Sequence, residues 1–492
     1  MNKIINYKRL IAITNKLVLN KKNNYEMFCI PFFHVIKGND YHYRNYSFLF
    51  SKNVLIFFKN LFISFISFFI FIFKIFSKKF NYNNSSFFKK KYNYLFVSHL
   101  VNRKHLREKQ DFHFGKVPFF YKKSTGMIYL NHISKLNSLD DLRLLNNFPL
   151  PIYILINQNC ISNYFIILGR VLKQSFKVLK FIKFKSSLLA IKVIIFGFIK
   201  SFDRSTFYNH VLFFEFFSLI KKTSPKFLIF TFEGQSYERV IIYAAKLANP
   251  KIKIIGYQNS PIIKNQNTFL LKFKPKFMPD EIWTSGSFCK KVIKNKFKIK
   301  TKILGSPKFI HQNTISKNIY LNARKKFTCL VAPEGVLSET YILFNFCLNY
   351  LKIHNNINFL WRLHPEISKE KLFNNFSFFN YNSNEVKFTN NKDTDFISSD
   401  LFLYRGTTLV TQAVKFGLRP LYLSLGQKDF NIDPLYKYQH IWKKTICTYR
   451  DLNIVVNEKF SNVDKLDFTK KVSGFSNTIL QKVDYNIINN LR

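Results

Sequence analysis

The chain alternates between short apolar runs, rich in β-branched and aromatic residues, and segments with helical periodicity. The clearest unit is the run Phe227–Phe232 followed by Ser236–Ala248, whose apolar residues recur at the spacing of one helix face. Strands that alternate with helices predict parallel β-α-β units. Further strands are predicted at Tyr94–Leu100, Pro151–Ile156, Lys251–Tyr257, Glu281–Thr284, Lys302–Leu304, Phe327–Ala332, Asn358–Leu363, Val386–Thr389, Asp400–Tyr404 and Leu418–Leu423, and further helices at Phe213–Lys222, from Ser338 and at Thr407–Phe416.

At 492 residues the chain is too long for one ordinary hydrophobic core, which favours two domains. The alternation pauses at 311–326, a polar stretch rich in Lys and Asn that suits a linker. We therefore predict an α/β protein with two Rossmann-like domains that face each other across a cleft. The predicted organisation is a basic and aromatic extension at 1–90, a first Rossmann-like domain at 91–310, the linker at 311–326, a second Rossmann-like domain at 327–430 and a mostly helical tail at 431–492.

The N-terminal extension contains an apolar segment at 54–76. Its longest uncharged stretch runs from Asn60 to Phe73, which is shorter than the roughly 20 apolar residues that a membrane-spanning helix needs. Lys59 and Lys74 bracket this stretch. A buried apolar helix and an in-plane membrane anchor with lysines at the lipid headgroups both fit the pattern, and a single span is a third alternative.

The formal net charge is +50, which normally indicates polyanionic partners. Only 14 of the 77 basic residues are Arg, whereas nucleic-acid readers favour the planar guanidinium that pairs with phosphate and guanine. The charge is also spread over the chain instead of forming one arm. The composition therefore argues against nucleic acid as the partner and favours anionic lipid and anionic substrates such as nucleotide-sugars.

Ligands of open parallel sheets collect at the carboxyl ends of the strands, so candidate residues are sought there. Glu233 ends a predicted strand, and Gly234 allows a sharp turn into the next helix. A carboxylate at this position could take a proton from a hydroxyl group. The alternative is that Glu233 only caps the helix, with Glu238 favourable in its first turn.

A second candidate group follows the predicted strand Asn358–Leu363. Arg362 and His364 alternate along the chain and so share a face, and Pro365 holds the loop. Together they could grip a phosphate and stabilise a leaving group.

The third candidate group is Arg405 and Gly406, which follow a strand, with Thr407 or Thr408 capping the next helix. Hydroxyls and N–H groups at a helix N-terminus form an anion-binding arrangement. We predict contact with a phosphate or ribose there, and an ordinary capped helix is the alternative.

Weaker candidates lie at other strand ends. Glu334 could bind a ribose or a base. The alternative for each of the weaker candidates is that the residue only stabilises a turn. The remaining cleft candidates are Gly234, Glu238, Gln258, Ser260, His99 and His113. The pair Asp393 and Asp395 is interpreted as turn chemistry, and we predict no metal site and no cofactor. The sequence has no P-loop and no G-x-G-x-x-G, so an ATPase and a dinucleotide-binding enzyme are not supported.

The runs FEGQSYERVIIYAAK, IGYQNS, EIWTSG, ILGSPK, PEG, RLHP and YRGTTLVTQAVKFGLRPLYL occur in this order between Tyr94 and Leu423. In these residues the chain resembles bacterial glycosyltransferases of surface carbohydrate (capsule, O-antigen), which have the GT-B fold. A more distant similarity is to sialyltransferases and Kdo transferases, with an acidic-acidic-Gly motif and a His-Pro motif. This similarity implies Glu233 as general base, His364 as a contact to the phosphate of CMP, and metal-independent, inverting transfer. Phe232 stands where that motif has its first acidic residue.

The resemblance implies a sugar transferase whose first domain binds the acceptor and whose second domain binds a nucleotide-sugar. The acceptor would be a surface polysaccharide or a lipid-linked glycan, and the enzyme would be cytoplasmic and peripheral to the anionic inner membrane. The His-Pro pair is also similar to that of teichoic-acid-type glycerophosphotransferases, so transfer of a polyol phosphate from CDP-glycerol is the alternative. A nucleic-acid-binding protein is a distant third alternative, supported only by charge.

Overall fold

The computed structural model describes most of the chain. The described residues are 3–18, 25–34, 47–50, 84–100, 103–130, 139–155, 161–182, 187–264, 273–309, 326–365, 367–376, 384–426, 430–438, 440–458 and 462–491, with Leu55, Lys59, Phe62, Ile63 and Ile66. The apolar segment at 54–76 and the linker at 311–326 therefore lie almost wholly outside the described residues. Within the described part, no helix is long and apolar enough to cross a membrane.

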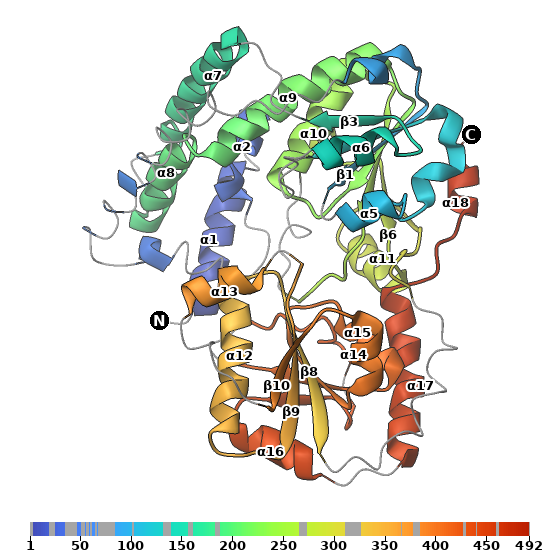
Figure 1. Ribbon diagram of the computed structural model, residues 1–492. Helices are drawn as coiled ribbons and strands as arrows, with labels where there is room; N and C mark the ends of the chain where they lie inside the picture. The colour runs from blue at the N-terminus through green and yellow to red at the C-terminus, as the bar shows by residue number, and fades with distance from the viewer. Residues whose placement is uncertain are drawn as a thin grey trace.

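Two parallel sheets organise the chain (Figure 1). The first has the order β3-β2-β1-β4-β5-β6-β7 and the second the order β10-β9-β8-β11-β12-β13, and neighbouring strands are parallel throughout. The strands of the first sheet are β1 Tyr94–His99, β2 Thr125–Leu130, β3 Ile152–Leu155, β4 Phe227–Thr231, β5 Lys253–Gln258, β6 Glu281–Thr284 and β7 Lys300–Ile303. Those of the second are β8 Phe327–Pro333, β9 Ile357–Arg362, β10 Val386–Thr389, β11 Leu401–Arg405, β12 Arg419–Leu423 and β13 Lys444–Ile446.

Helices fill the connections between the strands. The α-helices are α1 Lys3–Val18, α2 Tyr25–Cys29, α5 Arg103–Arg107, α6 Leu139–Asn146, α7 Ile161–Leu179, α8 Leu188–Lys200, α9 Arg204–Thr223, α10 Ser236–Ala248, α11 Ser287–Lys294, α12 Leu337–Leu351, α13 Lys369–Asn375, α14 Lys392–Ser398, α15 Val410–Ala413, α16 Tyr449–Asn457, α17 Asn462–Ile479 and α18 Asn486–Asn489. Among the 3₁₀ turns are η3 Ser85–Lys89, η4 Val117–Ser124 and η9 Val414–Phe416.

The first sheet is buried on both faces, as parallel sheets generally are. Alternate residues of β1 belong to different hydrophobic clusters: Leu95 and Val97 pack with α9 and α10, whereas Tyr94 and Phe96 pack with η4 and α6. This two-sided burial explains why the strands read as continuous apolar runs in the sequence.

The end of the chain links the two domains. Helix α17 packs against both η9 and α11. After it, the backbone N–H of Ser306 donates to the carbonyl of Gln481 (2.8 Å), and the hydroxyl of Tyr94 donates to the carbonyl of Leu491 (3.3 Å). The tail therefore leaves the second domain and ends on the first.

The predicted α/β class and its two Rossmann-like halves are confirmed, and every predicted strand is present. Two strands, β2 and β13, were not predicted. Because β13 lies beyond residue 430, the second sheet extends into the segment predicted as a helical tail. The helix predicted at Thr407–Phe416 is instead the short helix α15 and the turn η9, which ends at Gly417 with φ +80°.

Candidate active site

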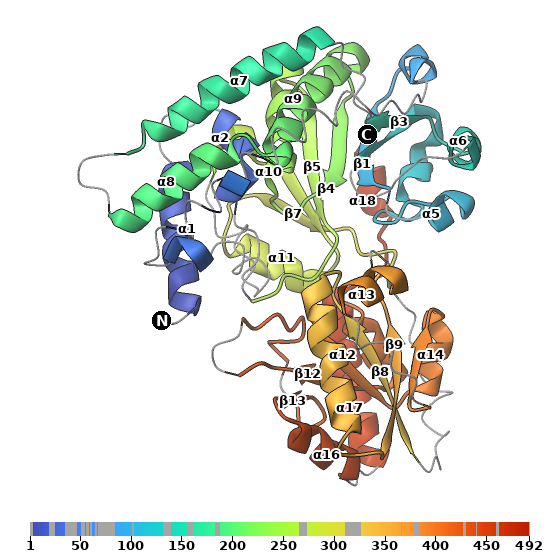
Figure 2. The same cartoon turned by 60° about the vertical axis from the view of Figure 1, so that its left-hand side comes forward.

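The carboxyl ends of the two sheets are turned toward each other. Helices α11 and α13, which leave the carboxyl ends of β6 and β9, both lie at the junction of the domains (Figures 1 and 2). The strand order reverses between β1 and β4 in the first sheet and between β8 and β11 in the second. Such reversals are where open α/β sheets bind ligands. The architecture is GT-B.

The turn between β4 and α10 involves two glutamates, Glu233 and Glu238, which have different roles. Glu238 is buried and accepts hydrogen bonds from the backbone N–H groups of Glu233 (3.0 Å), Gly234 (2.6 Å) and Gln235 (2.7 Å). Gly234 turns the chain with φ +83°. Burial raises the pKa of Glu238 to about 8. Glu238, predicted as a cleft candidate, is therefore a capping residue, and Glu233 is not needed as the cap.

Substitution Glu238→Ala should lower the free energy of unfolding by about 2–4 kcal/mol, because it leaves three N–H groups of the turn without their acceptor. Urea denaturation followed by tryptophan fluorescence measures this change. The control is Glu370→Ala, which removes an exposed acid from the first turn of α13 and should change stability little. Equal stabilities of the two variants would contradict the capping role of Glu238.

Glu233 lies beside the end of β5. Its Oε1 accepts a hydrogen bond from the hydroxyl of Ser260 (2.8 Å), and its Oε2 lies 3.5 Å from the side-chain nitrogen of Gln235. Gln258 is buried and donates to the carbonyl of Ser260 (3.0 Å), which fixes the loop that presents Ser260. The structure thus brings the sequence candidates Glu233, Gln258 and Ser260 together.

The two histidine candidates of the first domain lie next to this group. His99 ends β1, and its Nε2 is hydrogen-bonded to the hydroxyl of Tyr237 (3.0 Å). The His113 ring is 5.8 Å from the His99 ring, and its Nδ1 is hydrogen-bonded to the side chain of Asn259. Burial, and then the charge of Lys308, holds the pKa of His113 well below its ordinary value. His113 therefore contributes a neutral ring.

Lys308 is a functional candidate that sequence reasoning missed. Burial lowers its pKa, and the carboxylates of Glu233 and Asp111 oppose this shift. Its ammonium lies 4.5 Å from the ring centre of Phe112, and its carbonyl accepts a hydrogen bond from Gln412 of the second domain (3.1 Å). Lys308 follows β7 as Glu233 follows β4, so the strand-end rule applied to β7 would have found it.

In the second domain, two glycines allow close approach of predicted site residues. A methyl group on Gly335 would lie 2.8 Å from Nδ1 of His364, so the imidazole packs on the backbone after β8. A methyl group on Gly406, which has φ +65°, would lie 2.7 Å from Cδ of Glu334. His364, Glu334 and Gly406 therefore converge at the carboxyl ends of β9, β8 and β11.

Arg405, for which contact with a phosphate or ribose was predicted, is paired inside the second domain. Its side chain is buried, and Nε donates to Oε2 of Glu339 (2.6 Å) while NH1 donates to the carbonyl of Leu423 (2.7 Å). A buried carboxylate on α12 thus neutralises the guanidinium inside the domain. Removing either partner would leave an uncompensated buried charge, which indicates a structural ion pair.

Arg362 is also paired, although its side chain is partly exposed. Its NH1 donates to Oδ2 of Asp395 (2.7 Å), and Asp395 also accepts from Thr389. This pairing balances the charge that was predicted to hold a phosphate. It also accounts for Asp395, and no group of three or more potential metal ligands occurs among the described residues.

Thr407 and Thr408 do not cap the next helix as predicted. Helix α15 begins at Val410 with Leu409 as its N-cap, and no side chain caps it. The hydroxyl of Thr407 accepts from the N–H of Leu409 (3.3 Å), and the carbonyl of Thr408 accepts from Thr411. These residues form a turn before a helix of four residues.

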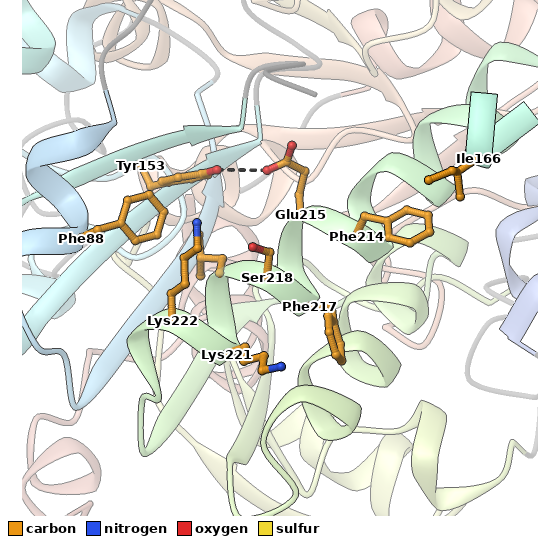
Figure 3. A pocket seen from close by; sticks show the side chains of 10 residues that line it. Phe88, Tyr153, Ile166, Phe214, Glu215, Phe217, Ser218, Lys221 and Lys222 are labelled. Carbon is orange, nitrogen blue, oxygen red and sulfur yellow. Dashed lines mark hydrogen bonds between the residues drawn. The ribbon is translucent and has the colours of Figure 1, made fainter. Parts of the chain in front are cut away.

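A cavity of about 710 Å³ lies elsewhere in the first domain (Figure 3). Tyr153 of β3 donates a hydrogen bond to Glu215 of α9 (3.0 Å), and burial raises the pKa of Glu215. The last turn of α9, with Lys222, leads to the amino end of β4. The cavity is therefore at the opposite end of the strands from Glu233.

Solved structures with a similar fold include the glycotransferase of kitacinnamycin, at 8% identity with a TM-score of 0.44, covering 78% of this chain and 94% of that one. MurG of Acinetobacter baumannii has 9% identity and a TM-score of 0.43, with coverage of 81% and 98%. MnaA of S. aureus, solved with UDP, has 9% identity and a TM-score of 0.43, with coverage of 82% and 96%. No protein-family model matches the sequence, and no curated protein matches it either.

Proposed function

We propose that the chain is a glycosyltransferase that moves a sugar from a nucleotide-sugar to a surface-polysaccharide or lipid-linked glycan acceptor. The observation that carries the proposal is the position of Glu233. Its carboxylate is not needed by the α10 cap, it lies at the strand reversal of the first sheet, and Ser260 orients it. His364 and Glu334 lie at the carboxyl end of the second sheet, which is turned toward the carboxyl end of the first.

In the proposed reaction, Glu233 accepts the proton of an acceptor hydroxyl. The hydroxyl oxygen forms a bond to the anomeric carbon of the donor sugar, while the bond from that carbon to the phosphate oxygen breaks. The electron pair leaves with the nucleotide phosphate. Lys308 and His364 would stabilise the charge that develops on that phosphate, so we propose that transfer needs no metal ion. Glu334 would contact the ribose or the base.

We further propose that the enzyme works at the cytoplasmic face of the inner membrane, where lipid-linked acceptors are found. The net charge of +50 supports this location, because the inner leaflet is anionic. Nucleic acid is not a partner in this proposal, since the basic residues are mostly Lys and are spread over the chain.

A thermal-shift series with nucleotides tests the proposal. A donor that binds only the folded protein should raise the Tm by roughly 5 °C at about 100 times its Kd. CMP, UDP, GDP, their sugars and CDP-glycerol are compared, and the shift should shrink in His364→Ala. Stabilisation by a nucleotide-sugar supports sugar transfer, and stabilisation by CDP-glycerol alone supports the polyol-phosphate alternative. A Tm that no nucleotide changes would contradict the proposal.

A further inference from the structure

Helices α7 and α8 form a helical hairpin that is inserted in the connection from β3 to β4. The hairpin projects from the outer side of the first domain, away from the junction with the second (Figure 2). Helix α7 packs against α8 and α9. Since α9 alone already provides a crossover back to the sheet, the hairpin is not required for strand connection, and we call it the α7–α8 arm.

Helix α7 has two apolar faces. Ile167, Val171 and Val178 form the buried face and are fully inaccessible. Phe165, Leu172 and Phe176 lie on the opposite face at helical spacing, and they are 66%, 43% and 61% exposed. Exposed apolar residues continue at the tip of the arm and on the same helix: Ile166, Ile182 and Leu188.

The arm is also strongly basic. Residues 161–200 contain eight Lys or Arg and no Asp or Glu. Lys173 of α7 and Lys180, directly after the end of α7, are exposed. A face of this kind, with large apolar side chains, interspersed lysines and no acidic residue, complements a surface that is apolar below and anionic above.

We propose that the α7–α8 arm docks on an anionic phospholipid bilayer, with Phe165, Leu172 and Phe176 inserted among the acyl chains and Lys173 and Lys180 at the headgroups. A protein partner is less well matched, because protein interfaces are depleted in Lys. A nucleic acid would leave the exposed Phe and Leu side chains in water. The inference rests on the proposed membrane association and assigns it to a surface of the chain. Because donor binding does not depend on this surface, the two proposals can be tested separately.

Sedimentation of the full chain with lipid vesicles tests this proposal. Vesicles of phosphatidylglycerol and phosphatidylcholine in equal amounts are compared with vesicles of phosphatidylcholine alone. The triple variant Phe165→Ser, Leu172→Ser, Phe176→Ser should bind the anionic vesicles at least about tenfold more weakly, because burial of three large apolar side chains is lost. Lys173→Gln with Lys180→Gln should weaken binding by a further fivefold or more and reduce its salt dependence.

The matched control is the triple variant Ile353→Ser, Ile441→Ser, Ile454→Ser, which removes apolar side chains of the second domain that are 62%, 66% and 53% exposed. It should bind vesicles as the wild type does. Circular dichroism and the nucleotide thermal shift report whether each variant is folded. Vesicle binding unchanged by the α7 substitutions would overturn the proposal, since the contact would then lie elsewhere, for example at 54–76. The proposal would also be overturned if the wild type did not bind vesicles and formed a dimer in sedimentation velocity that the α7 triple variant did not form. The exposed face of α7 would then contact a second copy of the chain.

Discussion

Glu233→Gln should lower the kcat of sugar transfer by about 10²–10⁴-fold, the range in which general bases contribute. The amide has the size of the carboxylate and can still accept the hydrogen bond that Ser260 donates (2.8 Å). It cannot accept a proton from the acceptor hydroxyl. The loss should therefore appear in kcat, with little change in the KM for the donor. Initial rates at saturating donor and acceptor measure it.

The control for this prediction is Glu215→Gln. Glu215 is also a carboxylate of the first domain, but it lines the cavity beside β3 and is hydrogen-bonded to Tyr153 (3.0 Å). This variant should retain full activity. Ser260→Ala should have an intermediate effect of about tenfold, because Ser260 only positions the base. If Glu233→Gln were as active as Glu215→Gln, the assignment of Glu233 as the base would be wrong.

The fold could be predicted from the sequence because its strands are buried on both faces and so read as continuous apolar runs. The strands that escaped prediction lack this signal. Strand β2 begins with Thr125 and Gly126, and β13 has only three residues. Helix α7 has a basic side with Arg170, Lys173 and Lys177, but its apolar residues cover both the buried side and an exposed side, so the sequence does not show which apolar residues pack in the core.

The candidate site could be predicted in position but not in detail. Glu233, Ser260, Glu334 and His364 do lie at the carboxyl ends of strands, as the strand-end rule predicts, because that location depends only on local order along the chain. It could not show which carboxylate caps α10, since Glu233 and Glu238 both suit that position. It also could not show that Arg405 pairs with Glu339, which lies 66 residues earlier, because that contact depends on the packing of α12 against β11.

The structure differs most from the sequence-based prediction in the basic side chains that were expected to bind the phosphate. Both arginines that the sequence suggested are paired with carboxylates of the second domain. Lys308 remains at the junction, close enough to Glu233 for their charges to interact, with its carbonyl bonded to Gln412 of the second domain. The negative charge on the leaving phosphate would therefore be stabilised by Lys308 of the first domain and His364 of the second.

Lys308→Met and His364→Ala should each lower kcat/KM by about 10²–10³-fold, the effect of removing one donor that stabilises a developing negative charge. Methionine keeps an unbranched side chain only one atom shorter than that of lysine, and the hydrogen bond from Gln412 to the carbonyl of residue 308 is retained. Lys302→Met is the matched control, because that ammonium lies 3.5 Å from Glu281, away from the carboxyl ends of the strands. It should keep nearly full activity.

The double variant Lys308→Met with His364→Ala tests whether the two side chains act on one phosphate. Groups that stabilise the same charge are coupled, so the combined loss should be smaller than the product of the two single losses. Independent roles would give a loss equal to that product, and His364 would then contact another part of the donor. If Lys308→Met alone had the kcat/KM of the wild type, Lys308 of the first domain would have no role in phosphate binding. The charge of the leaving nucleotide would in that case have to be stabilised by the second domain alone.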